Sequence, residues 1–249
     1  MSSPSNSAAS SETGVLYGLG VGPGDPDLIT LKALKILKQV DQIFTAASTK
    51  AEASLAGRIV SAHLPSQAEL RILAFPMSND SSELDRAWQA NAEEVAQVLR
   101  SGQSAAFLTI GDCLTYSTFS YLLTRLFIIM PEAKVESVPG IASYQLAASK
   151  LNRPLVLGRE TLSVVGGAND DNLEKLLEAS DNLVILKAYQ STSSIIDRLK
   201  ALGLAKAASL CVNLALPGEK IVERLDDDFE EPMSYFSLIL VNKRLLNKN

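Results

Sequence analysis

The sequence predicts an α/β protein of two domains, with a parallel sheet in the first and a mixed sheet in the second. Three observations lead to this class. Short apolar runs alternate with amphipathic stretches up to about residue 138, the run Ser104 to Ile110 is apolar throughout as in strands buried on both faces, and strands outnumber helices after Leu151. With 249 residues, 47% of them hydrophobic, the chain has enough apolar material for two cores.

The first half reads as alternating strands and helices. The expected strands are Val15 to Gly20, Gln42 to Ala46, Ser104 to Ile110 and Lys134 to Val138. The expected helices are Asp27 to Gln39, Ser82 to Arg100 with Ser81 or Ser82 as N-cap and Gly102 at its end, and Thr115 to Ile129. Because parallel neighbours need helical crossovers, this pattern favours a parallel sheet.

The second half has a different composition of elements. The expected strands are Thr161 to Val165, Leu183 to Lys187, Ser209 to Leu214, Ile221 to Leu225 and Tyr235 to Asn242, and the expected helices are Asp170 to Ala179 and Ser191 to Leu202. Two strands follow each other directly, which indicates a mixed or antiparallel sheet. We therefore expect a Ser-rich disordered tail over residues 1–13, one domain over 14–138, and a second over 139–249.

Three loops of the first domain follow strands and are candidates for a ligand site. They are Gly20 to Asp25, Gly111 to Tyr116 and Pro139 to Ser143. Ligands of parallel sheets bind beyond the carboxyl ends of the strands, so we expect the three loops to lie at one edge.

The first loop, in LYGLGVGPGDPDLITLKALKIL (Leu16 to Leu37), is rich in glycine, which permits positive φ and close approach to a ligand. A dinucleotide fingerprint is disfavoured, because Pro23 or Asp25 stands where the third glycine belongs. A Walker loop is excluded, since no glycine precedes a lysine. A tight turn without a ligand remains an alternative.

Composition excludes several function classes. The net charge of −5, from 28 acidic and 23 basic residues without a basic block, argues against nucleic acid or anionic membrane as partner. The two cysteines, Cys113 and Cys211, lie far apart and His63 is the single histidine, so no intrinsic metal site is expected. No apolar stretch is long enough to span a membrane, and the N-terminus resembles no targeting peptide, so we expect a cytoplasmic protein.

A set of sequence blocks resembles the tetrapyrrole methylase family in order and spacing. The blocks are GLGVGPGDPDLITLKAL, FLTIGDCLTYSTFSYL, SVPGIASYQLAA, LVILKAY, LPGE and YFSLILV, and they extend over nearly the whole chain from Gly14 to Lys243. Within the family, FPMS at Phe75 to Ser78, the Tyr-Ser-Thr run after TIGD, and YFS before the last strand are similar to the branch that methylates C-20 of precorrin-2.

This resemblance implies transfer of a methyl group from S-adenosylmethionine to C-20 of cobalt-precorrin-2, cobalt-factor II or metal-free precorrin-2 in cobalamin biosynthesis. It implies two α/β domains with the cofactor in a cleft between them, a homodimer, and cobalt carried by the substrate rather than by the protein. Two alternatives remain: a related methylase acting at another ring position, and a non-catalytic module that binds the cofactor.

The resemblance also implies site residues. Those matching the family's cofactor positions are Pro23, Ile110, Gly111, Asp112, Thr115, Ala142, Ser143, Lys187, Leu214 and Phe236. Those expected to border the substrate trough are Gly22, Pro23 and Tyr116.

Two positions depart from family patterns. Cys113 stands where the family often has proline, and we expect a partly buried small side chain there, with a nucleophile as the alternative. Relatives that methylate uroporphyrinogen carry an Asp in the stretch matching Thr45 and Ala46; its absence here counts against that branch.

Methyl transfer from a sulfonium needs alignment and exclusion of water rather than an activated nucleophile, which fits a chain without a recognisable triad. The catalytic group remains unknown, with Asp112 and Tyr116 as candidates. The alternatives are an N-cap for Asp112 and a half-buried packing aromatic for Tyr116.

Other charged residues and the single histidine are further candidates for ligand contacts. Asp25 is expected to brace its own loop, and His63 to be solvent-exposed rather than a ligand of the substrate's cobalt. The basic residues that could face substrate carboxylates are Lys50, Arg125, Arg153 and Arg159.

Overall fold

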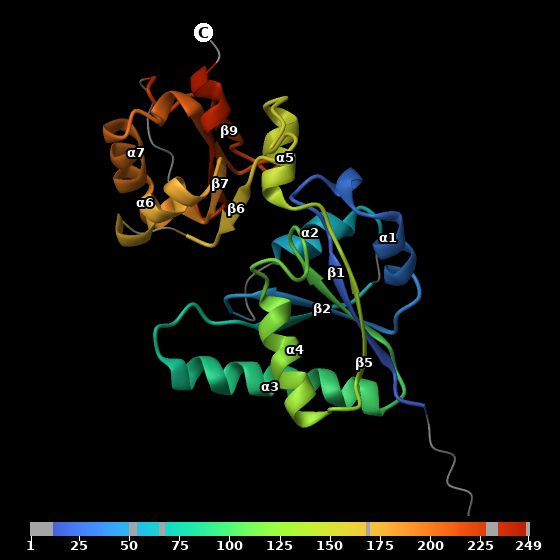
Figure 1. Ribbon diagram of the computed structural model, residues 1–249. Coiled ribbons are helices and arrows are strands. Elements are labelled where there is room, and N and C mark those ends of the chain that lie inside the picture. Colours follow the sequence, from blue (N-terminus) through green and yellow to red (C-terminus); the bar gives the residue numbers. More distant parts are fainter. Residues whose placement is uncertain (1–11, 50–53, 65–67, 168–169, 228–233, 248–249) are drawn as a thin grey trace, which may run out of the picture. The chain divides into compact units, whose positions relative to one another are not determined.

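The computed structural model describes residues 12–49, 54–64, 68–167, 170–227 and 234–247. The expected tail over residues 1–13 lies outside the described part except for Glu12 and Thr13, and so does Lys50. The chain forms two compact units (Figure 1). One comprises Met1–Gly22 and Pro26–Gly140, and the other Pro23–Asp25 and Ile141–Asn249.

The first unit contains a five-stranded sheet in the order β3-β2-β4-β1-β5, and all its pairings are parallel. Its strands are β1 (Val15–Gly20), β2 (Gln42–Ala47), β3 (Leu70–Ala74), β4 (Ala105–Thr109) and β5 (Lys134–Val138). Its helices are η1 (Pro26–Leu28), α1 (Leu31–Leu37), α2 (Leu55–Ser61), α3 (Ser81–Arg100) and α4 (Thr118–Ile129). The predicted parallel α/β organisation is confirmed.

Helices cover both faces of this sheet, as the alternation along β4 shows. Phe107 packs in the core cluster shared with α3 and α4, whereas Ala106 and Leu108 pack in the cluster shared with α1 and α2. All five residues of β4 are buried, as the apolar run predicts. Gly18 on β1 is required by this packing, because a Cβ there would lie 2.2 Å from the ring of Phe119.

The second unit contains a five-stranded mixed sheet in the order β6-β7-β10-β8-β9, in which only the β6–β7 pairing is parallel among the described strands. Its strands are β6 (Leu162–Val165), β7 (Asn182–Leu186), β8 (Ala208–Val212), β9 (Lys220–Val222) and β10 (Ser237–Asn242). Its helices are α5 (Ser143–Lys150), α6 (Asp170–Ala179), η2 (Ala188–Gln190), α7 (Thr192–Ala201), η3 (Ala205–Ala207) and η4 (Lys243–Asn247). The predicted mixed sheet is confirmed.

Several predicted boundaries are wrong because the capping side chain differs from the expected one. Asp80, rather than Ser81 or Ser82, caps α3 by accepting from the Ser82 amide. Thr30 caps α1, so the α-helix begins at Leu31 and not at Asp27. The prediction also missed α2, β3 and α5, which are short and carry weak periodicity.

Candidate active site

The three loops predicted to form a ligand site do meet in the first unit. Gly22 and Gly111 form an antiparallel bridge, in which each amide donates to the other's carbonyl, at 3.3 Å from Gly22 and 2.7 Å from Gly111. The Gly140 amide donates to Oδ2 of Asp112 at 3.2 Å. The loops after β1, β4 and β5 are therefore joined by direct hydrogen bonds at the carboxyl ends of their strands.

Two glycines at this edge allow the backbones of neighbouring loops to come into contact. A Cβ at Gly140 would lie 2.1 Å from the carbonyl oxygen of Gly111, and one at Gly20 would lie 2.5 Å from the Gly140 nitrogen. Real Cβ atoms do not approach backbone so closely, so these positions require glycine for internal packing. Gly22 and Gly24 instead have φ of +84° and +149°, where a side chain is strained.

Asp112 holds its own loop and is not the cap of α4. Its Oδ1 accepts from the amide of Leu114 at 3.0 Å and from the hydroxyl of Thr115 at 2.9 Å. The cap of α4 is Ser117, which accepts from the Phe119 amide. The N-cap alternative for Asp112 is wrong because α4 begins at Thr118, beyond the reach of the Asp112 carboxylate.

Tyr116 lies in the same loop with φ of +51°, in the left-handed region that non-glycine residues rarely adopt. The residue is 51% exposed, which fits the half-buried aromatic of the alternative interpretation as well as a trough wall. The role of Tyr116 as a wall of a binding trough stays a prediction, and its strained backbone is of the kind found at functional sites. Ile110 and Gly111 precede it on the same loop, directly after β4.

Cys113 is the small core side chain that the sequence predicted, but it is more deeply buried than expected. It is fully buried in the core with α3 and α4, and its thiol donates to the carbonyl of Val138 at 3.4 Å. Burial raises the pKa of this thiol, and the Asp112 carboxylate adds to the rise. A thiol held protonated is a poor nucleophile, so the nucleophile alternative is not supported.

The second unit brings together its own predicted cofactor residues, Lys187, Leu214 and Phe236. Strand β10 pairs with β7 through Leu238 and Leu186, and with β8 through Ser237 and Val212. The segments that carry the three residues therefore emerge side by side at one edge of the mixed sheet. The amide of Asn213 donates to the carbonyl of Phe236 at 2.8 Å, which fixes two of these segments to each other.

This edge is rich in left-handed backbone. Lys187, Asn213 and Ala215 have φ of +54°, +51° and +57°. Such conformations persist only where the surroundings enforce them, and they concentrate at functional sites. Asn213 and Ala215 were not predicted as site residues; an asparagine tolerates this conformation and gave a weak signal, but Ala215 gave none.

Side chains hold these strained residues. The amide of Ala215 donates to the Glu219 carboxylate at 2.6 Å, and Oδ1 of Asn213 accepts from the Ser234 hydroxyl at 2.7 Å. The Lys187 ammonium lies 5.8 Å from the centroid of the Tyr235 ring, within cation–π range. The short segment Pro23–Asp25 belongs to this unit too, and a Cβ at Gly24 would lie 2.9 Å from the carbonyl oxygen of Leu214.

Ala142 and Ser143 lie at the start of α5. Ala142 is the N-cap, and its amide donates to Oε1 of Gln145 at 2.8 Å. Ser143 is the first helical residue. The Pro-Gly turn that precedes them thus leads directly into a helix, which the sequence-based prediction missed.

Two of the four basic residues predicted to face substrate carboxylates have structural partners. Arg125 pairs with Asp85, and Arg153 binds the Ser209 hydroxyl at 2.7 Å and the Glu223 carboxylate at 2.9 Å. His63 is partly buried, not fully exposed, and its Nε2 donates to the carbonyl of Pro26 at 2.9 Å. Arg159 is exposed, and the bracing role of Asp25 stays a prediction.

Neither a metal-binding cluster nor a membrane-spanning helix occurs among the described residues. No group of three or more His, Cys, Asp or Glu side chains among them is placed to hold a metal ion. No helix in this part of the chain is long and apolar enough to cross a membrane.

The fold is that of a two-unit α/β protein whose loops gather at the ends of the strands. Comparison with known families and structures identifies the class of protein to which it belongs. The model of the family "Tetrapyrrole (Corrin/Porphyrin) Methylases" matches residues 15–227, and the chain belongs to this family. Solved structures agree on the fold: a cobalt precorrin-4 methyltransferase matches with a TM-score of 0.68 over 93% of this chain and 95% of that one, at 20% identity. A uroporphyrin-III C-methyltransferase from Thermus thermophilus matches with a TM-score of 0.63 over 95% and 98%, at 23% identity.

Three relatives with 34–36% identity are all named for methylation at C-20 of precorrin-2 or of its cobalt form. The chain is 36% identical to the cobalt-precorrin-2 C(20)-methyltransferase of Salmonella typhimurium, over 93% of this chain and 97% of the relative. It is 36% identical to a probable cobalt-precorrin-2 C(20)-methyltransferase of Methanocaldococcus jannaschii, over 92% and 96%. A precorrin-2 C(20)-methyltransferase of a Sinorhizobium species is 34% identical over 92% and 95%.

Proposed function

We propose that this protein transfers a methyl group from S-adenosylmethionine to C-20 of cobalt-precorrin-2 or cobalt-factor II in cobalamin biosynthesis. The observation that carries the proposal is similarity over nearly the full length of both chains to relatives named for this reaction. We favour the cobalt form because both relatives at 36% identity are named for it, while the relative at 34% is named for the metal-free form.

The chain's residues fit a cofactor held largely by backbone groups. S-adenosylmethionine, when bound, supplies an electrophilic methyl group. Left-handed residues follow β7 and β8 in the second unit, where Lys187 and Leu214 lie, and Phe236 lies beside them directly before β10. The remaining proposed contacts are Pro23, Ile110, Gly111, Asp112, Thr115, Ala142 and Ser143.

The proposed roles of the side chains are positioning roles. The Asp112 carboxylate fixes the Leu114 and Gly140 amides and so keeps the loops after β4 and β5 in register. Tyr116, with Gly22 and Pro23, would border the substrate trough and exclude water from it. The proton that leaves C-20 after methylation can pass to solvent, so no buried base is required.

Incubation of the purified chain with S-adenosylmethionine and either cobalt-precorrin-2 or metal-free precorrin-2 tests the function. We expect a mass gain of one methyl group, located at C-20 by NMR, with the cobalt form turned over faster. Methylation at another ring carbon would replace the C-20 assignment, and cofactor binding without any methylated product would favour a binding module.

Two further proposals concern the state of the protein. We propose a homodimer in the cytoplasm, acting on a small tetrapyrrole and not on nucleic acid or membrane. Light scattering of the purified chain tests the dimer, and a mass of 26.7 kDa would show a monomer instead.

A further inference from the structure

A second polar centre lies in the second unit, on strands β7 and β10. Asn182 begins β7 and Asn242 ends β10, and the two are directly opposite each other in the antiparallel register. Residues that are opposite each other share one face of a sheet, so the two amides are neighbours. They are 3% and 8% exposed.

Each amide has a buried oxygen that accepts no hydrogen bond from the described residues. Buried polar atoms of this kind are rare, because an unmatched acceptor loses its hydration without compensation. Two such atoms on neighbouring residues indicate a shared donor.

The orientation of both amides is fixed by their nitrogens. Nδ2 of Asn182 donates to the Glu160 carboxylate at 3.1 Å and to the carbonyl of Thr161 at 3.3 Å. Nδ2 of Asn242 donates to the carbonyl of Pro154 at 3.1 Å. Rotating either amide would set its oxygen against another acceptor, so the oxygens cannot exchange places with the nitrogens to bond each other.

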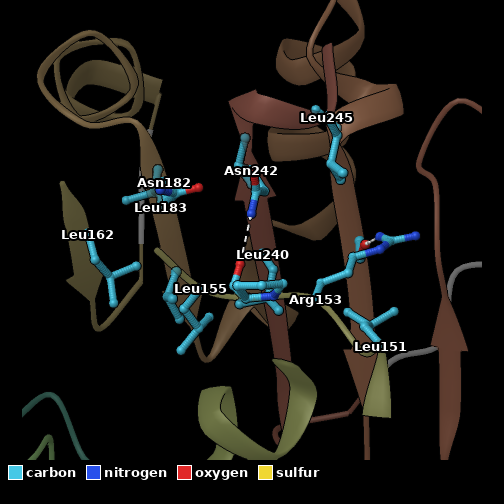
Figure 2. A pocket seen from close by; sticks show the side chains of 14 residues that line it. Leu151, Arg153, Leu155, Leu162, Asn182, Leu183, Leu240, Asn242 and Leu245 are labelled. Atoms are coloured by element: carbon cyan, nitrogen blue, oxygen red, sulfur yellow. Dashed lines mark hydrogen bonds between the residues drawn. The ribbon is translucent and has the colours of Figure 1, made fainter. Parts of the chain in front are cut away.

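A small cavity adjoins both residues (Figure 2). Besides the two asparagines, its lining includes Leu155, Leu162, Val184 and Leu240, and it offers about 20 Å³ to a water molecule. That volume suffices for one water and little more. The other polar side chains of the lining are engaged, since Arg153 donates to Ser209 and Ser209 donates to the carbonyl of Glu223.

We propose that this cavity binds one internal water molecule, which donates its two hydrogens to Oδ1 of Asn182 and Oδ1 of Asn242. A water has the number of donors that the two acceptors require. A calcium-type cation needs six or more oxygen ligands and prefers carboxylates, whereas the described lining has no carboxylate and two side-chain oxygens without a hydrogen bond.

The water would complete a hydrogen-bond network that fixes the segment after α5 to the sheet. Through their nitrogens the two asparagines hold Pro154 and Glu160 to the sheet, and Arg244 binds the same two residues, the Pro154 carbonyl at 2.9 Å and the Glu160 carboxylate at 2.8 Å. The site is independent of the proposed methyl transfer and is tested without cofactor or substrate.

Magnetic relaxation dispersion of water nuclei on the full chain counts long-lived internal waters. Val184→Ile adds a methylene on the face that lines the cavity, and Val212→Ile adds one on the opposite face of the sheet, against the α7 core. We expect Val184→Ile to lose one long-lived water relative to the wild type and Val212→Ile to lose none. Equal counts in the wild type and Val184→Ile would overturn the proposal.

Stability and crystallography provide independent readouts. Because displacement of the water leaves two buried acceptors unmatched, Val184→Ile should lower Tm by roughly 3–10 °C, whereas filling a dry cavity would leave Tm unchanged or raise it. A high-resolution crystal structure should show a solvent peak at about 2.7–3.2 Å from both oxygens. A dry cavity, or a direct bond between the two amides, would contradict it.

Discussion

The two units hold their loops at the sheet edge by opposite means. In the first unit, glycines let the loops after β1, β4 and β5 touch backbone to backbone, and Asp112 ties them. In the second, non-glycine residues are held in left-handed conformations by the side chains of Glu219 and Ser234. Gly20 and Gly140 at the first edge therefore have no room for a Cβ, whereas the second edge holds strained backbone that a change of Ala215 to glycine would relax.

The largest effect is expected from Gly140→Ala. Its Cβ would lie 2.1 Å from the Gly111 carbonyl, and the loss should be about 3 kcal/mol of unfolding free energy or more. Trp88, the single tryptophan, lies in the first unit and reports its unfolding in urea by fluorescence. As the control in the same unit, Gly102→Ala at φ +85° meets only the Glu12 carbonyl oxygen, 3.4 Å from its Cβ, and should lose only about 1 kcal/mol. Similar losses at both positions would refute the packing account.

The next effect is expected from Asp112→Ala, which leaves the Leu114 and Gly140 amides without this acceptor. We expect a loss of about 1–2 kcal/mol in urea unfolding and a weaker affinity for S-adenosylmethionine by calorimetry. Asp181 in the second unit makes a similar pair of hydrogen bonds, because its carboxylate accepts from the amide and the hydroxyl of Thr161. Asp181→Ala is therefore the control, in which we expect lower stability without a change in cofactor affinity. Unchanged affinity in Asp112→Ala, together with lower stability, would limit Asp112 to a structural role.

A smaller effect of opposite sign is expected from Ala215→Gly. Glycine adopts φ near +57° without a Cβ clash, so relief of strain should exceed its extra chain entropy and raise the unfolding free energy by about 0.5–1 kcal/mol. Asn213→Gly is the control, because asparagine tolerates this conformation and its side chain binds Ser234. Scanning calorimetry should show a higher Tm for the first variant only; no gain at Ala215 would mean that its backbone is not strained.

The smallest effect concerns pH. The amide of Ala215, and then the Lys150 side chain, lower the pKa of the Glu219 carboxylate from its usual 4.5. The carboxylate therefore contributes stability that is present above pH 4.5 and is lost as pH falls through the lowered pKa. The stability difference between wild type and Glu219→Gln should shrink between about pH 5 and pH 3. A difference independent of pH would contradict this assignment.

Local sequence patterns predicted much of the fold, because a strand buried on both faces of a sheet is apolar along its whole length. The apolar run at β4 and the direct succession of strands after residue 208 predicted a parallel and a mixed sheet, and both are confirmed. Short elements such as α2 and α5 were missed, since about two turns carry too little periodicity to separate from loops.

Of the candidate site, the sequence by itself determined which loops follow strands, and family resemblance determined which positions to compare. Only the tertiary structure decided that Gly140 must be glycine, that Asp112 binds its loop and not α4, and that Ala215 is left-handed. Likewise, only the register of β7 against β10 places Asn182 beside Asn242. The physical reason is distance along the chain: apolar periodicity is a local property, whereas a close approach or a shared hydrogen bond depends on partners far away in sequence.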